Sequence, residues 1–544
     1  MLFSHCIALL VCLASCQAKR VVVDWNIGYV TLSRDEYFTK QSIGVNGKLP
    51  VPPVYITQGD TLVLNVANSL DKPTSVHAHG IFQHGTSYMD GAGMVTQCGI
   101  PPGANFTYEY AINQSGTYWI HGHYNHQNTD GLRTPLIVYD KDMDKLPMKY
   151  DEDVLIALED WYPVPIEEQL KLIWNPKVPF PPPPSYPTGL INGINGNVTQ
   201  VVNMEPGKKY RFRVLNMGTT EWFKFSIPGH KLTVIEADGE YSDPMTVDGL
   251  DIGPGQRYSA IVQAMDSVEY NYIFNATLYA DFIAAAPGLN PRYYTGLIQY
   301  KAGAPIKLIE PKADSKMEWT QDIKMQAYDR MPLLDVSRTV DTSTVTKLFS
   351  DNLTRTILHR YPYTMPPKVP TLFSAMSMGE LAVDSAIYGL QTDAVVISKG
   401  EVIEILLTNE SPLYHAMHLH GHSFQVTEYG PAGNSSLIGK PPAPVVRSGP
   451  YPMRRDTFVV PAYQYIRVRF LADNPGVWLF HCHMDIHFAI GLAMTFIEAP
   501  KELQKTQHIP QTLKQMCLAQ GLGASGNGAG NMGLDLTGLP APPE

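Results

Sequence analysis

Three stretches of the chain repeat one pattern, in which a Gly leads a run of alternating apolar and polar residues that ends at an Asn. The stretches are residues 59–68, 207–216 and 400–409, and in each the Asn stands nine residues after the Gly. Alternation with a period of two is typical of a β-strand with one buried face. Because the same offsets occur three times, the pattern favours three related β-sandwiches over three unrelated β-domains.

The first and last repeats share further residues. Segment 116–121 matches 476–481, each with a His five residues after its Gly, and the sequence His-x-His-Gly occurs at 77–80 and again at 418–421. We therefore expect metal ligands on the outer two sandwiches and none on the middle one.

These repeats predict an all-β chain of several units. The units are a signal peptide 1–18, domain 1 at 20–145, domain 2 at 146–310, a connector 311–359 with a helix at 333–351, domain 3 at 360–500, and a tail 501–544. From residue 518 onward the tail is rich in Gly, Ala and Pro, for which we predict disorder.

Composition supports this organisation. A chain of 544 residues is too long for a single domain with one hydrophobic core. Its 44 Pro and 43 Gly indicate a turn-rich β-protein. The net charge of −10 argues against a nucleic-acid or anionic-membrane surface.

The N-terminal segment resembles a secretory signal, with an apolar run from Cys6 to Ala14 and small residues before the end at Ala18. No later apolar run is long enough for a membrane anchor, so we expect a secreted or cell-surface glycoprotein. Seven Asn-x-Ser/Thr sequons fit this expectation, of which Asn409, followed by Glu-Ser-Pro, is the least suited. The sequons are Asn105, Asn113, Asn197, Asn275, Asn352, Asn409 and Asn434.

Cysteine use points to one metal ligand and one disulfide. Three of the six Cys leave with the signal, and the mature chain keeps Cys98, Cys482 and Cys517. If Cys482 binds a metal, the other two are free to pair in an oxidising compartment. We therefore predict a disulfide between Cys98 and Cys517.

The stretch around Cys482 has the pattern of a buried strand, since Trp478, Leu479 and Phe480 lead into it. Side chains alternate faces along a strand, so Cys482 points to one side while His481 and His483 point to the other. A metal on Cys482 would then be connected by short covalent paths to metals on the two histidines. This is the arrangement of an electron conduit.

Histidines recur in closely spaced pairs. Chance would give roughly 0.5 His-x-His pairs among 17 histidines, whereas the chain holds five, at 77/79, 121/123, 418/420, 420/422 and 481/483. Because residues i and i+2 of a strand face the same way, each pair can present two imidazoles to one metal or to two neighbouring metals. The pairs 77/79, 121/123, 418/420 and 481/483 give eight imidazoles from two domains, which predicts a metal cluster between domains 1 and 3.

Three further ligand-type residues, His415, Cys482 and His487, form the two-His, one-Cys set of a blue-copper site. Leu492 occupies the position where a Met would be the axial ligand, and a non-ligating Leu should raise the potential. Zinc, the alternative metal, prefers four ligands and usually several Cys. We assign no metal role to His84, His126, His230, His359 and His422.

Four motifs carry a resemblance to the multicopper oxidases, which include laccases, ascorbate oxidase and fungal iron-uptake ferroxidases. They are 77–98, 121–123, 415–422 and 481–492, in the family's order. The resemblance implies three cupredoxin-like Greek-key domains and four copper ions. Ala78 and Gly122 replace an aromatic residue and a Ser that relatives usually have, and the pairing of Cys98 with Cys517 resembles a laccase disulfide.

By this likeness the ligands divide into three sets. His415, Cys482 and His487 would bind type 1 copper, and His77 with His418 would bind type 2. The type 3 pair would be bound by His79, His121, His123, His420, His481 and His483.

The family mechanism would pass single electrons from a reductant through Cys482 to His481 and His483, and reduce O₂ to water at the cluster. Asp90 and Asp485 match acids that relatives place beside the cluster, where a carboxylate can relay protons. For each of these two residues, a purely structural role in capping a turn stays open.

The reductant is the open question. Segments 451–456 and 474–478 resemble the ferroxidase branch most, yet that branch places carboxylates where this chain has Pro at 181–184 and Ser411. Glu410 lies one residue out of register, and Asp281 is a further candidate. We therefore expect a monomeric, laccase-like oxidase of phenols, with Fe²⁺ oxidation as the alternative. A non-enzymatic copper store is disfavoured by the complete set of ligands.

Overall fold

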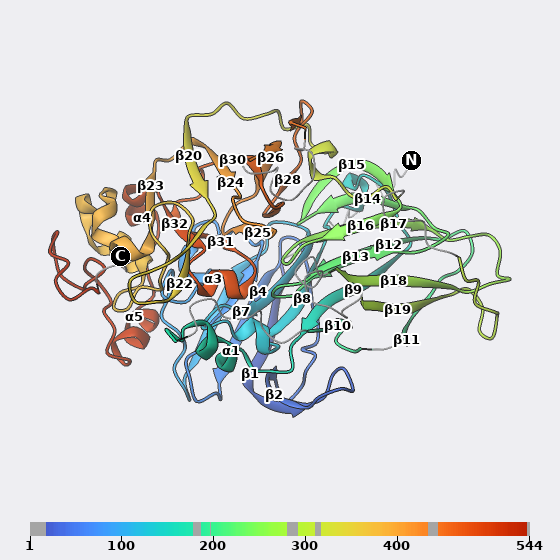
Figure 1. The fold of residues 1–544 in the computed structure, drawn as a ribbon, viewed down its shortest axis with the longest axis horizontal. Coiled ribbons are helices and arrows are strands. Elements are labelled where there is room, and N and C mark those ends of the chain that lie inside the picture. The colour runs from blue at the N-terminus through green and yellow to red at the C-terminus, as the bar shows by residue number, and fades with distance from the viewer. Residues whose placement is uncertain are drawn as a thin grey trace, which may run out of the picture.

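The computed structural model confirms the predicted all-β fold and organises it into three domains, each built from two main sheets (Figure 1). The residues that it describes are 18–177, 187–195, 197–279, 292–309, 317–432 and 444–540. The signal peptide, Pro181 to Pro184 and Asp281 therefore lie outside the described residues. No described helix is both long and apolar enough to cross a membrane.

The first domain consists of two four-stranded sheets around one core. One sheet contains, in spatial order, β2 (Lys40–Val45), β1 (Arg20–Leu32), β4 (Thr61–Asn68) and β6 (Asn105–Ala111). The other contains β3 (Val54–Thr57), β8 (Arg133–Tyr139), β7 (Gly116–Gly122) and β5 (Val76–His79). Strand β6 alternates exposed residues with the buried Phe106, Tyr108 and Tyr110, so its apolar face closes the core.

The middle domain consists of a six-stranded and a five-stranded sheet. The larger sheet contains β10 (Thr188–Ile191), β9 (Glu152–Trp161), β12 (Lys209–Asn216), β17 (Arg257–Gln263), β14 (Leu232–Ala237) and β15 (Glu240–Val247). The smaller contains β11 (Asn197–Asn203), β19 (Arg292–Gln299), β18 (Tyr272–Tyr279), β13 (Trp222–Ser226) and β16 (Gly249–Ile252). A short helix, α1 (Ile166–Ile173), packs its apolar side against residues 486–490 of the third domain.

The third domain is also a two-sheet unit. One sheet contains β20 (Arg338–Ser343), β24 (Val402–Thr408), β30 (Gln464–Leu471), β26 (Phe424–Pro431) and β27 (Val446–Arg447), with β28 (Arg454–Arg455) also paired to β26. The other contains β23 (Ala394–Ile397), β32 (Ala493–Glu498), β31 (Gly476–Cys482), β25 (His415–Leu419) and β29 (Thr457–Val460). The remaining helices are α2 (Thr371–Ser377), α3 (Asp485–Ala489), α4 (Pro500–Thr506) and α5 (Gln511–Leu518).

The helix predicted at 333–351 is wrong, because this segment contains strands. Strand β20 pairs in parallel with β24, and β21 (Val345–Leu348) forms a hairpin with β22 (Thr354–Ile357). Val340 and Thr342 are buried in β20 while Thr339 and Asp341 are exposed. The period of two in this β-branched run outweighs the weak helical pattern.

The disorder predicted for the tail is also wrong for residues 518–540. Asn527 is fully buried, and its side-chain oxygen accepts from the backbone N–H groups of Ala529 and Asn531. Its amide donates to the carbonyls of Gly533 and Asp535. The glycine-rich composition permits the positive φ angles of this compact loop, so one buried amide organises a segment without an apolar core.

The tail is anchored to the first domain by the predicted disulfide between Cys98 and Cys517, which is confirmed. One hydrophobic core continues from the first domain into residues 363–394, strand β31 and helix α5. The first and third domains therefore pack as a single body, and their shared surface is the place where the His-x-His strands meet.

Candidate metal centre

Successive side chains of strand β31 point into two different hydrophobic cores. Val477 and Leu479 pack in the core shared with the first domain, whereas Trp478, Phe480 and Cys482 pack in the core of the third domain. By the same alternation, His481 and His483 point to the side of Val477 and Leu479. The opposite orientation expected for Cys482 and its neighbours therefore follows from the burial of two apolar faces.

A first cluster of ligand-type residues surrounds Cys482. The Sγ atom of Cys482 lies 3.7 Å from Nδ1 of His415 and 3.6 Å from Nδ1 of His487, and these two nitrogens are 3.0 Å apart. All three residues are buried. β25 supplies His415, and α3 turns the chain back after β31 to supply His487.

Without a metal, Cys482 and His487 carry no charge, so this cluster does not repel a cation. Burial raises the pKa of the Cys482 thiol to about 12 and lowers the pKa of His487 to about 4, so both groups are neutral in the metal-free protein near pH 7. Burial makes ionisation of the Cys482 thiol unfavourable, but a bound metal ion makes it favourable because the metal binds the thiolate. Two imidazoles and one thiolate form a donor set that copper prefers.

Leu492 contacts both ends of this cluster through its backbone. Its carbonyl accepts from the N–H of Cys482, and its own N–H donates to the carbonyl of His487. The side chain is buried in the core of the third domain and carries no donor atom. The position is thus close to the cluster, as expected, but supplies no ligand.

Eight imidazoles form a second cluster, which we call the imidazole cage. Its members are His77, His79, His121, His123, His418, His420, His481 and His483. Within it three triads have ligand atoms within 4.8 Å of one another: 77/79/418, 79/121/483 and 123/420/481. In the sheets, His77 faces His121 across β5 and β7, and His418 faces His481 across β25 and β31.

The ring nitrogens of the cage differ in their partners. In His77, His79, His121 and His418 one nitrogen has a protein partner and the other has none, whereas Nε2 of His420 and Nε2 of His481 lie 3.2 Å apart. Nδ1 is the engaged atom in five of them: His77 with the carbonyl of Asp90, His121 with that of Gly122, His418 with that of Asp456, His420 with the Asp90 carboxylate and His481 with the carbonyl of Cys482.

The remaining nitrogens test whether a metal fits. Among the described residues, Nε2 of His77, His121 and His418, Nδ1 of His79 and both nitrogens of His483 are buried without a hydrogen-bond partner. Leaving such atoms unpaired costs on the order of 1–3 kcal/mol each. One ring nitrogen held by protein and the other left free is the arrangement of metal-binding histidines, so the residues fit a metal cluster.

Burial keeps six of the cage imidazoles neutral: His79, His121, His123, His420, His481 and His483. It is the main cause that lowers the pKa of His123 to about 3 and the pKa values of the other shifted members well below the usual range. Neighbouring imidazoles lower these values further. Neutral imidazole is the form that binds metal.

The two predicted acids occupy different places. Asp90 is fully buried, with Oδ2 2.9 Å from Nδ1 of His420 and Oδ1 3.2 Å from Nδ1 of His77. Burial would raise its pKa, but His420 and His77 outweigh burial and hold the pKa far below the usual range. Asp485 begins α3 and accepts from Oγ1 of Thr129 at 2.6 Å, with His126 3.6 Å away.

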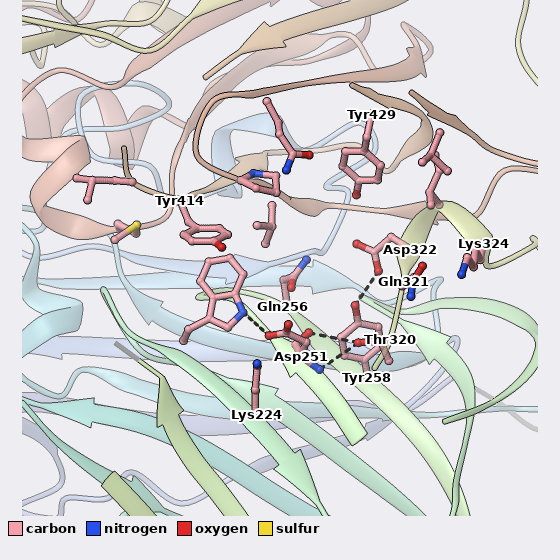
Figure 2. Close-up of a pocket in the computed structure, with 18 of the residues that line it drawn as sticks. Lys224, Asp251, Gln256, Tyr258, Thr320, Gln321, Asp322, Lys324, Tyr414 and Tyr429 are labelled. Atoms are coloured by element: carbon pink, nitrogen blue, oxygen red, sulfur yellow. Dashed lines mark hydrogen bonds between the residues drawn. The ribbon is translucent and has the colours of Figure 1, made fainter. Parts of the chain in front are cut away.

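Two cavities lie near these clusters. The first, of about 560 Å³, is lined by residues of the middle domain, the connector and the third domain, and includes Tyr414, the neighbour of His415 (Figure 2). Its wall contains Trp222, whose ring lies 5.5 Å from Tyr414 and whose Nε1 donates to Asp251 at 2.6 Å. The second, of about 360 Å³, contains His121, His123, His481, His483 and Asp485 in its wall.

Asp456 is a contact of the cage that sequence reasoning did not single out. Its carboxylate lies 3.0 Å from Nε2 of His79, and the residue is 1% exposed. The available signal was the run of charges at 454–456 between two strands, because buried charges need partners.

None of the five histidines given no metal role joins a ligand group among the described residues. Three have other partners: His230 with Tyr300, His359 with Asp393 and His422 with Glu498. His126 lies near Asp485, and His84 contacts the ring of Phe82.

Comparisons with known proteins identify relatives of this architecture. Three family models described as multicopper oxidase match residues 26–143, 152–302 and 364–502. The iron transport multicopper oxidase fetC of Epichloe festucae is 35% identical over 96% of this chain and 83% of its own length. The iron transport multicopper oxidase fio1 of Schizosaccharomyces pombe is 35% identical over 98% and 85%.

Two solved structures resemble the whole chain. Fet3p, a multicopper oxidase that functions in iron import, has a TM-score of 0.89 and 29% identity, covering 96% of this chain and 99% of that one. The laccase from Botrytis aclada has a TM-score of 0.76 and 26% identity, covering 93% and 92%.

Proposed function

Since this chain belongs to the multicopper oxidase family, and is thus a copper oxidoreductase that uses O₂, we propose that it oxidises Fe²⁺ to Fe³⁺. The observation that carries the proposal is the likeness to iron oxidases over nearly the full chain, with a TM-score of 0.89 for Fet3p against 0.76 for the laccase. The phenol oxidation expected from the sequence thereby becomes the second candidate.

Four copper ions are part of the proposal. His415, Cys482 and His487 would hold type 1 copper, His77 and His418 type 2, and the other six cage members the type 3 pair. Copper in these sites would accept single electrons from a reductant and deliver four of them to O₂. The unpaired nitrogens of the cage support this assignment.

The chain itself would supply three things to the reaction. Cys482 would provide the covalent path, since it ends β31 and its two chain neighbours, His481 and His483, are cage members. Burial keeps six of the cage imidazoles neutral and thus able to bind metal, namely His79, His121, His123, His420, His481 and His483. Asp90 and Asp485 would move protons, Asp90 through its contacts with His420 and His77 and Asp485 from the wall of the second cavity.

Carboxylates in the first cavity support a cationic reductant. Glu221, Asp251 and Asp322 line this cavity, and carboxylate oxygen is the ligand that hard cations prefer. Glu410, the candidate from the sequence, is exposed, and its backbone N–H donates to Oγ1 of Thr344. The reaction would consume four Fe²⁺, one O₂ and four protons and release four Fe³⁺ and two waters, and we propose a secreted or cell-surface monomer.

The second candidate, oxidation of phenols, rests on the aromatic wall of the same cavity. Trp222 and Tyr414, the residue before His415, present two rings to the cavity, which is large enough for a planar aromatic. Ser411, which has no charge, contacts the His415 ring.

O₂ uptake by the copper-loaded protein distinguishes the candidates. A higher kcat/KM for Fe²⁺ than for a panel of phenols and naphthols supports iron oxidation, and the reverse order supports phenol oxidation. Trp222→Ala should lower turnover of phenols and spare Fe²⁺ if the aromatic wall binds substrate. No O₂ uptake with any donor would overturn both candidates.

A further inference from the structure

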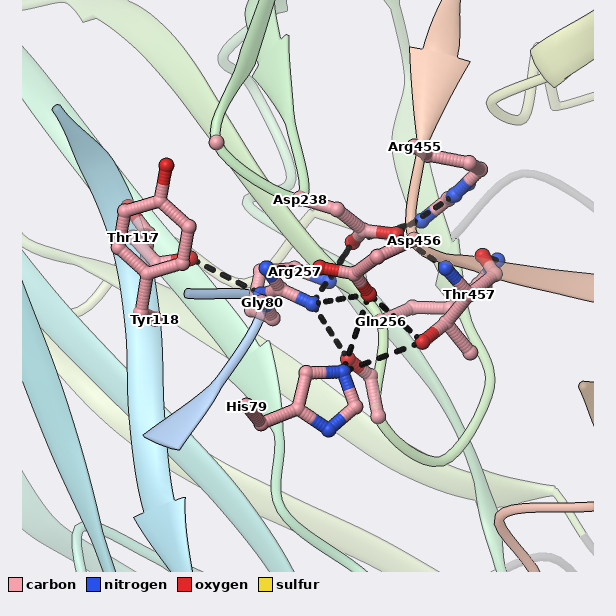
Figure 3. A network of polar contacts seen from close by, with 12 residues as sticks. His79, Gly80, Thr117, Tyr118, Asp238, Gln256, Arg257, Arg455, Asp456 and Thr457 are labelled. Atoms are coloured by element: carbon pink, nitrogen blue, oxygen red, sulfur yellow. Dashed lines mark hydrogen bonds and ion pairs between the residues drawn. The ribbon is translucent and has the colours of Figure 1, made fainter. Parts of the chain in front are cut away.

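One carboxylate connects all three domains at the edge of the imidazole cage (Figure 3). Asp456 belongs to the third domain, and its partners His79 and Arg257 belong to the first and middle domains. The middle domain supplies no cage member, but its Arg257 binds Asp456, which in turn contacts the cage member His79. Arg257 is not itself a proposed copper ligand, so its place beside the cage needs another explanation.

Arg257 grips Asp456 with two parallel hydrogen bonds. Nη1 donates to Oδ1 at 2.8 Å, and Nη2 donates to Oδ2 at 2.7 Å. Paired bonds of this kind fix the carboxylate plane as well as its position. Both side chains are buried, with Arg257 fully so.

Arg257 is itself held in place. Its Nε donates to the carbonyl of Thr117 in β7, and its backbone N–H donates to Asp238. Asp238 in turn binds Arg455, the residue before Asp456, at 2.8 Å and 3.0 Å. The guanidinium is therefore anchored to two domains before it reaches the third.

Gly80 makes room for this ion pair. It has a φ of +88°, and a Cβ added to it would lie 2.6 Å from both Nη2 of Arg257 and Oδ2 of Asp456. The approach of the pair thus explains the Gly at position 80, which follows directly after His79.

His79 differs from other cage members in the ring nitrogen that has a protein partner. Nε2 is its engaged atom, 3.0 Å from Oδ1 of Asp456 and 3.2 Å from Oγ1 of Thr457, and Nδ1 is left without a partner. In five other members Nδ1 is the atom that contacts a carbonyl or a carboxylate, and in three of these, His77, His121 and His418, Nε2 is left without a partner. A carboxylate accepts only, so its contact requires the proton on Nε2 and makes Nδ1 the donor toward the metal.

We propose that Arg257 is a positioning residue for the cage: through Asp456 it fixes the ring orientation and the Nε2–H tautomer of His79. The middle domain thereby determines which nitrogen of a first-domain ligand faces the cage. The inference rests on the proposed copper ligands, but its direct readout, the tautomer, needs no metal.

The test compares Arg257→Gln with Arg257→Lys and with Arg211→Gln as the matched control. Arg211 is also a fully buried arginine of the middle domain, paired with Glu236, and none of its hydrogen bonds or ion pairs reaches Asp456. Loss of either arginine destabilises the fold, but only Arg257 should affect His79.

Long-range ¹H–¹⁵N correlation of copper-free, ¹⁵N-histidine-labelled protein reads the tautomer. The wild type and Arg211→Gln should carry the His79 proton on Nε2, and Arg257→Gln should show a mixture. After copper loading, Arg257→Gln should retain cage copper roughly 10- to 100-fold more weakly against a chelator, with newly EPR-visible copper but unchanged blue colour. Arg257→Lys, which keeps one charged donor, should lie between the two.

Wild-type retention and an unchanged tautomer in Arg257→Gln would overturn the inference. If that variant does not fold, the wild type still decides, because a proton on Nδ1 of His79 contradicts the proposed positioning. A wild-type protein that binds no copper would refute the proposed function and leave the tautomer result standing.

Discussion

The hydroxyl of Ser411 lies 2.9 Å from Nε2 of His415, on the ring edge opposite to the Nδ1 atom that faces Cys482. A residue at this position therefore touches a predicted copper ligand at the edge near the first cavity. The side chain at position 411 can therefore influence which reductant binds near His415 without itself becoming a metal ligand.

Ser411→Asp should raise kcat/KM for Fe²⁺ roughly tenfold, which corresponds to about 1.4 kcal/mol. A charged hydrogen-bonding group contributes on the order of 1.5–3 kcal/mol, and a carboxylate attracts the cation. Ser411→Asn, which matches Asp in shape without the charge, is the control. Equal effects of both substitutions would show that charge at this position is irrelevant.

Cys482→Ser should abolish the blue colour and nearly all turnover. The hydroxyl is a poor substitute for a thiolate, and the covalent path to the two neighbouring histidines would lose its metal. The disulfide is distant in sequence and should form normally, so mass spectrometry of the unreduced protein is the folding control. Retained turnover would contradict the electron path.

Opening the disulfide between Cys98 and Cys517 should release the tail before the rest of the chain unfolds. The bond closes a loop with a sequence separation of 419, for which the chain-entropy account gives up to about 6 kcal/mol. In Cys98→Ser/Cys517→Ser, limited proteolysis should cut within residues 518–540 first, and the thermal midpoint should fall. A protected tail in this variant would mean that the hydrogen bonds of Asn527 suffice.

Stability should fall in acid because of Glu236. Burial would raise the pKa of this carboxyl, but Arg211 and Arg213 outweigh burial and lower the pKa from 4.5 to about 2. A depressed folded-state pKa stabilises the protein above pH 4.5, and the stabilisation of about 3 kcal/mol is lost as the pH falls toward 2. Urea unfolding of Glu236→Gln should show a shallower decline between pH 4.5 and 2 than the wild type.

Asn409 should remain unglycosylated when the protein is secreted. The residue is fully buried, and its amide nitrogen donates to the carbonyls of Leu413 and Pro461. Asn105 and Asn113 are exposed and accessible to modification. Glycopeptide mass spectrometry reads all three, and a glycan on Asn409 would show that the loop before His415 opens during synthesis.

The strands that carry the candidate ligands were predictable because alternation and repetition reinforce each other there. His77, His121, His418 and His481 lie on short buried strands, where a period of two fixes which residues share a face. Their meeting across domains followed from pairing the repeats. The order of the tail was not predicted because it depends on the hydrogen bonds of one buried amide, Asn527. Amino-acid composition does not reveal such a residue.

The Arg257–Asp456 pair was beyond the reach of sequence alone. Its partners come from three domains, and His79 and Asp456 are 377 residues apart. No local period encodes such a contact. The charges at 454–456 indicated only that something unusual was buried there, whereas the partner could be found only from the packed structure.

The cage also sets an order of events in time. Asp90 meets His420 across 330 residues of chain, which a ribosome needs on the order of 20–60 s to make. When the first domain has been made, the chain carries four of the eight cage members and none of the three residues of the cluster around Cys482, so neither cluster is complete until the third domain follows. Colour would therefore mark molecules whose synthesis is complete, and a stalled or truncated chain would stay colourless however much metal surrounds it.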